Sequence, residues 1–159
     1  MKDYYLARVL HVAGVVLWIG GVAFVTSVLL PAVKRVREPA ERVKFFESVE
    51  AGFSRQARVT TLLTGLSGFY LTYKLEAWGR FAHAHFWWMH AMVLLWVIFT
   101  LMLFVFEPLW LHRWFQARAQ RDPDGTLAII VRLHWVLLAL SVITIAGAVA
   151  GSHGWSFGG

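Results

Sequence analysis

Four long stretches of the chain carry no Asp, Glu, Lys or Arg, and they constrain the fold more than any other feature. These stretches are 9–33, 59–73, 81–106 and 133–159. A helix needs about 20 residues to cross the hydrocarbon core of a membrane, so three of the stretches are long enough by themselves. The second becomes long enough when Arg58 and Lys74 are included, because their long side chains can extend to the membrane interface. We therefore predict an all-α integral membrane protein.

The predicted architecture is a four-helix transmembrane bundle formed by a single domain, 1–159. The transmembrane helices are expected at about 5–33, 56–78, 84–112 and 126–151. Between the first two helices, Val43, Phe46, Val49 and Phe53 recur at helical spacing, with charged residues on the opposite face. This pattern is typical of an amphipathic helix that lies on the membrane interface, and we expect it at about 39–54.

Positive charges gather at one end of the predicted bundle. The segment 34–58 contains seven Lys or Arg residues, and Arg113, Arg118, Arg121 and Arg132 lie in or beside the third connector. The positive-inside rule then places the first connector, between the first two helices, and the third connector, between the last two, in the cytoplasm. Both termini then lie on the outer side of a bacterial inner membrane. The formal net charge of +6 follows from this topology. Nucleic-acid binding is excluded as a function, because the sequence offers no soluble domain with a basic face.

Histidine is the residue type on which a metal or cofactor site would have to be built. The chain has no cysteine and seven histidines, which excludes disulfides, thiolate metal sites and iron–sulfur clusters. An ionisable side chain within the hydrocarbon is costly and commonly functional. By helix rise, His11 and His90 lie about 7 Å and about 5 Å inside the same predicted boundary. Two imidazoles at one depth on different helices can bind the iron of a b-type haem from both faces.

Small residues near His11 would leave room for a flat macrocycle. Gly14 lies near the face of the first helix that carries His11, Trp18 follows one turn later, and Gly65 lies on the second helix. These three residues are the candidate cofactor pocket. The alternative is that the glycines let membrane helices pack closely, with no cofactor involved.

A second polar region is expected near the cytoplasmic side. His134 lies roughly 10 Å from that side by helix rise, in the same zone as Glu107 and Arg132. The two charged residues are expected to neutralise each other as a structural ion pair, and a proton path or a quinone headgroup site are alternatives. His134 and His112 together would be the ligands of a second haem.

The remaining histidines lie on the predicted outer side. His83 and His85 belong to the second connector and His153 follows the fourth helix. Together they form a candidate copper or zinc set. His153 is also an alternative axial ligand for the haem, as is His134.

Two short motifs resemble known membrane proteins. The motifs are Tyr5-Leu6-Ala7-Arg8-Val9-Leu10-His11 followed by Gly14, Trp18, Gly20 and Gly21, and Trp88-Met89-His90 in the third helix. The first resembles the opening helix of the copper resistance protein D family and of the membrane-bound haem-containing protoporphyrinogen oxidases, and the second is similar to a Trp-x-His motif of the oxidases. Arg58, which precedes a second predicted helix that contains Thr and Gly, also matches this resemblance. The resemblance implies a four-helix bundle with a b-type haem held by His11 and His90.

The resemblance to the oxidases stops shortly after the third-helix histidine. That family typically has a lysine there, whereas this chain has Ala91, Met92 and Val93. A membrane-embedded b-type cytochrome that transfers single electrons is therefore the first prediction, with a quinone, an oxygen species or a redox protein as reaction partner. Such a protein would be a haem-dependent membrane oxidoreductase.

Other functions stay open. One alternative is a copper-handling membrane protein, a second is a protoporphyrinogen oxidase-like enzyme, and a third is an assembly subunit without a cofactor. The expected partners are the lipid bilayer and, in a homo-oligomer, a further copy of the chain. The first apolar run is too long for a signal peptide and has no small-residue cleavage site, so we expect it to be retained.

Overall fold

The computed structural model describes residues 2–36 and 38–155, and every regular element within them is helical. The all-α prediction is thus confirmed for the described chain. The elements are α1 (Lys2–Phe24), η1 (Val25–Leu29), α2 (Leu30–Lys34), α3 (Pro39–Lys74), η2 (Ala77–Ala82), η3 (Ala84–Phe86), α4 (Trp87–Leu101), η4 (Met102–Leu111), α5 (His112–Ala119) and α6 (Pro123–Ser152). The side chains of Val43 and His112 lie outside the described part of the structure.

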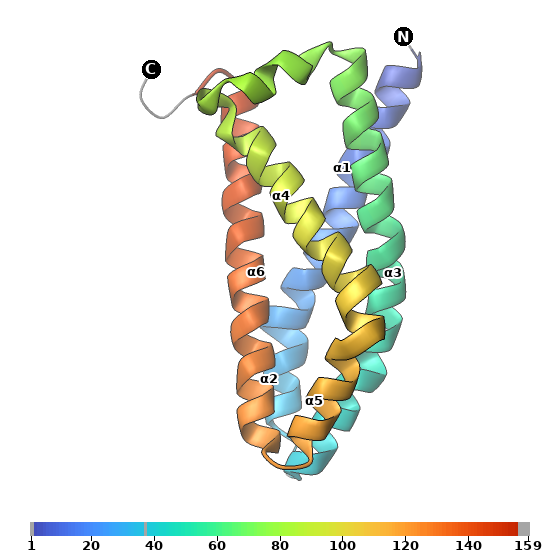
Figure 1. Cartoon of the computed structure of the whole chain (residues 1–159), viewed down its shortest axis with the longest axis vertical. Helices are drawn as coiled ribbons and strands as arrows, with labels where there is room; N and C mark the ends of the chain where they lie inside the picture. Colours follow the sequence, from blue (N-terminus) through green and yellow to red (C-terminus); the bar gives the residue numbers. More distant parts are fainter. Residues whose placement is uncertain (1, 37, 156–159) are drawn as a thin grey trace.

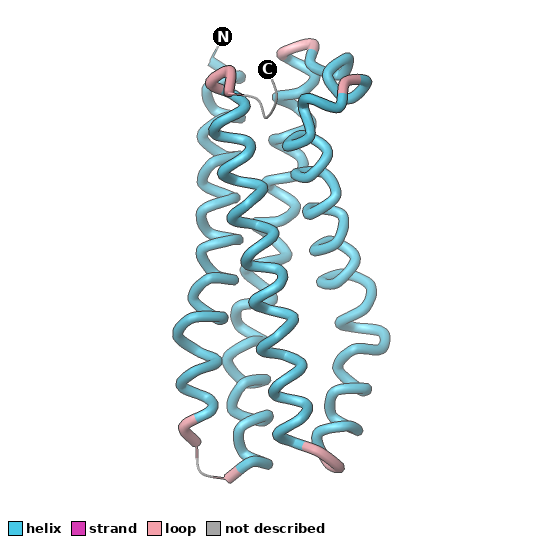
Figure 2. Tube along the Cα trace, turned by 90° about the vertical axis from the view of Figure 1, so that its left-hand side faces the viewer, coloured by secondary structure: helices cyan, strands magenta, loops and turns pink. Residues whose placement is uncertain are grey.

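The helices run side by side along the length of the molecule (Figure 1, Figure 2). α1, η1 and α2 follow one another in one rod, as do α4, η4 and α5. Both chain ends lie at the same end of the bundle as η2 and η3, while the α2–α3 and α5–α6 connections lie at the opposite end (Figure 1). α1 packs along α3 and α4 packs along α6.

Three segments of the described chain are long and apolar enough to cross a membrane. They are Lys2–Lys34, Ala84–Leu111 and Pro123–Ser152. Large apolar side chains cover their outward faces, and Val9, Leu94 and Leu109 are each more than half exposed. An apolar surface of this extent suits lipid rather than water. The chain therefore has the features of a membrane protein.

The sequence predicts an interfacial helix at 39–54 and a separate membrane helix at 56–78, but the structure has one continuous helix of 36 residues, α3. It ends at Lys74, and Glu76 then adopts a left-handed conformation with φ 51°. The apolar stripe that was expected to face lipid is instead turned into the bundle. Phe46 is only 2% exposed.

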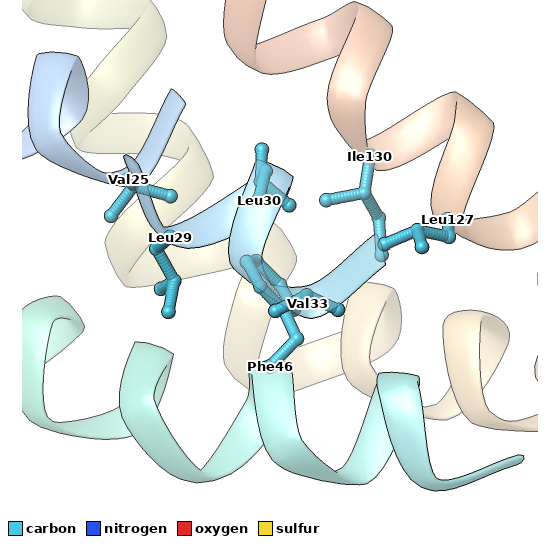
Figure 3. Close-up of a cluster of buried hydrophobic side chains, with 7 residues drawn as sticks. All are labelled: Val25, Leu29, Leu30, Val33, Phe46, Leu127 and Ile130. Carbon is cyan, nitrogen blue, oxygen red and sulfur yellow. The ribbon is translucent and has the colours of Figure 1, made fainter. Parts of the chain in front are cut away.

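Phe46 lies in a buried cluster formed by α3, the rod of α1, η1 and α2, and α6 (Figure 3). The other buried members are Val25, Leu29, Leu30, Val33, Leu127 and Ile130. Val49 and Phe53 pack against the same cluster. Periodicity shows that a helix has an apolar face, and here neighbouring helices cover that face.

Each of the two π-helical segments accompanies a proline. Pro31 lies just after η1, and Pro108 lies inside η4. Proline lacks an N–H, and its ring collides with the carbonyl four residues earlier, so a helix widens or bends at this point. π-helical turns are frequent at functional sites, and η4 also contains Glu107.

Candidate functional site

The ring of His11 is oriented by a backbone carbonyl of the neighbouring helix. Its ring is partly buried between α1 and α3, and Nδ1 lies 2.9 Å from the carbonyl oxygen of Thr64. A neutral imidazole donates its Nδ1–H to that oxygen, which leaves the Nε2 lone pair available, and metal-binding histidines are commonly oriented in this way. Gly68 on α3 lets the ring approach, since a Cβ at that position would lie 3.0 Å from Cε1 of His11.

His90 faces a different part of the molecule. It is exposed in the first turn of α4, with Nε2 3.0 Å from the carbonyl oxygen of Phe81 and Nδ1 3.3 Å from that of Phe86. Its ring also packs edge-on against Phe81, with centroids 5.4 Å apart. Within the described residues no hydrogen bond or ring contact joins His90 to His11. The structure therefore places the two predicted ligands near one end of the bundle, with no contact between them among the described residues.

The three residues of the predicted cofactor pocket have neighbours that fill the space beside them. A Cβ on Gly14 would collide with Thr64, and one on Gly65 would collide with the indole of Trp96. Trp18 is buried and packs edge-on against an aromatic ring of α4, with centroids 4.9 Å apart. Close helix packing accounts for these glycines in the described structure.

The outer histidines do not form a cluster. The rings of His83 and His85 are exposed and 5.8 Å apart, while Nδ1 of His153 donates to the carbonyl oxygen of Val149 at 2.8 Å. No group of three or more His, Asp or Glu in the described part of the chain could hold a metal ion. The predicted pairing of His112 with His134 around a second haem lies outside the described residues, because it needs the His112 side chain.

A cavity of about 350 Å³ lies between α1, α3, α4, η4, α5 and α6, in the half of the bundle nearer the α2–α3 connection. Its polar lining consists of Glu47, Glu50, Ser54, Glu107 and His134. Most of the remaining lining is aromatic or aliphatic, including Phe46, Phe53, Phe99 and Phe115. The cavity thus combines an apolar body with a few polar groups, as small-molecule sites commonly do.

Glu107 is held in this cavity by α3. The hydroxyl of Ser54 donates to its carboxylate, with Oγ 2.7 Å from Oε1 and 2.8 Å from Oε2. Arg58 adds an ion pair at 3.2 Å through Nη2, and its Nε donates to the carbonyl oxygen of Leu103 at 3.1 Å. The predicted partner, Arg132, is exposed on α6, and no ion pair of the described residues joins it to Glu107. Arg58, which was expected to extend to the interface, provides the positive charge.

Two further residues line the cavity, His134 and Glu50, and each has a polar group that no described hydrogen bond uses. His134 on α6 is partly buried; its Nδ1 lies 2.9 Å from the carbonyl oxygen of Ile130, and its ring packs edge-on against Phe46. No hydrogen bond among the described residues uses its Nε2. Glu50 on α3 lines the same cavity, and no described hydrogen bond or ion pair uses its carboxyl group.

Sequence reasoning found Glu107 and His134 but missed the contribution of α3. Glu50, Ser54 and Arg58 are spaced four residues apart, so they lie on one face of a helix. That spacing is visible in the sequence, but the apolar stripe of the same segment suggested that its charged face points to water.

None of the protein-family models, curated proteins or solved structures compared with this chain is similar to it. The function must therefore be argued from the two regions described above. One is the His11 imidazole between α1 and α3, and the other is the polar cavity between α3, η4 and α6.

Proposed function

We propose that the chain is a b-type cytochrome of a bacterial inner membrane that transfers single electrons, with His11 as an axial ligand of the haem iron. The observation that carries this proposal is the contact between Nδ1 of His11 and the Thr64 carbonyl oxygen, 2.9 Å long and partly buried. This contact favours the tautomer with the hydrogen on Nδ1, which leaves the Nε2 lone pair available to a metal. A haem bound there would supply the one-electron chemistry, and the protein would supply orientation and an apolar surrounding.

The second axial ligand is best assigned to His90. It lies three residues after the start of α4, and the start of α4 lies at the same end of the bundle as the start of α1 (Figure 1). To bind iron, its Nε2 has to leave the carbonyl oxygen of Phe81. His153 is the alternative at this end, because its Nδ1 already contacts a backbone carbonyl.

The proposed topology has four membrane crossings, with α3 as the fourth crossing segment beside the three strongly apolar ones. α3 has 36 residues and is about 54 Å long by helix rise, which exceeds a hydrocarbon core of about 30 Å. Its first half, which carries most of its charged residues, then extends to the cytoplasmic interface, and its second half crosses the membrane. The positive-inside rule puts both termini on the outer side.

An absorption spectrum of detergent-purified protein, oxidised and then reduced with dithionite, tests the proposal. We expect a Soret band and sharp reduced α and β bands, with about one haem per chain in a pyridine haemochrome assay. His11→Ala should abolish or convert this spectrum, while His83→Ala, a change at an exposed histidine, should leave it unchanged.

A colourless protein from haem-sufficient cells would contradict the proposal, and so would an unchanged spectrum of His11→Ala. Copper retained by the colourless protein would then favour the copper-handling alternative. An unchanged spectrum of His90→Ala alone would move the second ligand to His153.

A further inference from the structure

The cavity between α3, η4 and α6 is separate from the proposed haem ligand. Val22 lines it and lies on the same helix as His11, roughly 16 Å further along by helix rise. The cavity therefore needs a role of its own. Its volume of about 350 Å³ falls within the range of small-molecule sites.

The polar groups of the cavity differ in whether another side chain already binds them. Glu107 is already held by Ser54 and Arg58, so its charge is balanced within the protein. Glu50 and Nε2 of His134 have no such partner among the described residues. These two groups reach the cavity from different helices, α3 and α6.

The chemistry of Glu50 and His134 indicates which class of ligand the cavity could bind. A carboxyl group and an imidazole nitrogen can each donate or accept a hydrogen bond, depending on protonation. The phenyl rings of Phe46, Phe53 and Phe99 surround the same space. A ligand that uses all of these groups has an apolar, ring-containing body and two hydrogen-bonding atoms.

We propose that this cavity binds the headgroup of a membrane quinone or quinol, with Glu50 and His134 as hydrogen-bond partners of its two oxygens. The assignment rests on the proposed electron-transfer function, for which it supplies the class of reaction partner. A lipophilic cation is the competing occupant, because Glu50 offers it a carboxyl group that no described ion pair uses, but a cation would leave Nε2 of His134 without a partner.

The test uses decylubiquinone, a short-chain quinone, and measures its equilibrium binding to purified protein with and without haem. A photoreactive azido derivative of the same quinone then identifies the labelled peptides. We expect saturable binding, labelling beside Val22 or within the stretches 46–54, 99–115 and 130–137 that line the cavity, and at least tenfold weaker binding for Glu50→Ala and for His134→Ala. Glu41→Ala, an exposed change on the same helix, is the matched control and should bind as the unmodified protein does.

Ala51→Phe provides a second variant that keeps both polar groups. Ala51 lines the cavity, so a phenyl ring there should block quinone binding while the helical content of the protein stays unchanged. Unweakened binding in all three cavity variants, or labelling confined to residues outside the cavity lining, would overturn the assignment. So would tetraphenylphosphonium binding that depends on Glu50 and excludes the quinone.

The two proposals can fail separately. Quinone binding by a protein that never contains haem would leave the cavity assignment standing and remove the cytochrome. A normal haem spectrum without quinone binding would overturn the cavity assignment and leave the cytochrome standing.

Discussion

The side chains of Ser54, Arg58 and Glu107 form a polar network between α3 and η4, beside a cavity whose lining is mostly apolar. A charged group in such surroundings is costly unless it is paired, and removing one partner leaves the other charge uncompensated. Because both side chains of the ion pair are about one-third exposed, the expected cost of breaking it is moderate. The network fixes the position of η4 against α3.

Arg58→Met tests this network. We expect it to lower the free energy of unfolding by about 1–3 kcal/mol, because Glu107 loses its positive partner. Thermal unfolding in detergent, followed by circular dichroism, measures the change. Arg132→Met is the matched control on an exposed arginine and should change stability by no more than about 0.5 kcal/mol. Equal losses in both variants would show that the ion pair has no special role.

The glycines near His11 permit a test that separates packing from cofactor binding. A Cβ at Gly65 would collide with the indole of Trp96, whereas one at Gly20 meets nothing within 4 Å. Gly65→Ala should therefore destabilise the protein by about 1–3 kcal/mol through overpacking, and Gly20→Ala should be neutral or slightly stabilising. Thermal unfolding measures both. A changed haem spectrum at full stability in Gly65→Ala would instead favour a pocket role.

At the level of elements, the apolar runs were sufficient to predict the helical class and the three strongly apolar segments. They were not sufficient for α3, because the spacing of Phe46, Val49 and Phe53 defines an apolar face without defining what covers it. Lipid and neighbouring helices satisfy that face equally well. Likewise, the four-residue spacing of Glu50, Ser54 and Arg58 defines a polar face, but its partner on η4 depends on the way the helices pack.

Adjacent phenylalanines on α3 test its packing. Phe46 is 2% exposed in the cluster with α2 and α6, whereas Phe45 is 44% exposed. Phe46→Ala should cost about 3–5 kcal/mol of unfolding free energy, because it leaves a cavity. Phe45→Ala should cost less than about 1 kcal/mol, since a lipid-facing or water-facing ring loses little packing. If this half of α3 lay flat on the membrane surface instead, the two variants would have similar stability.

At the scale of the whole molecule, the number of crossings decides where the ends lie. With α3 as a crossing segment, both chain ends and η2 share one side, and the α5–α6 connection lies on the other, as the arrangement in Figure 1 suggests. Without that crossing, the three apolar segments alone would put the two ends on opposite sides of the membrane. The number of crossings also determines whether His11 and His90 can approach one haem.

Single cysteines introduced into the chain can distinguish these topologies, because the natural sequence contains none. Gly79 in η2 has open space around it, and Asp3, Ser152 and Gln120 are exposed. A membrane-impermeant maleimide added to intact spheroplasts should label Asp3→Cys, Gly79→Cys and Ser152→Cys, because the positive-inside rule places their end of the bundle outside. Gln120→Cys should be labelled only after the membrane is permeabilised. If α3 does not cross, Asp3→Cys lies on the side opposite to Gly79→Cys and Ser152→Cys, so labelling on only one of these two sides would exclude the fourth crossing. Labelling of Gln120→Cys alone would keep the four crossings and reverse the orientation.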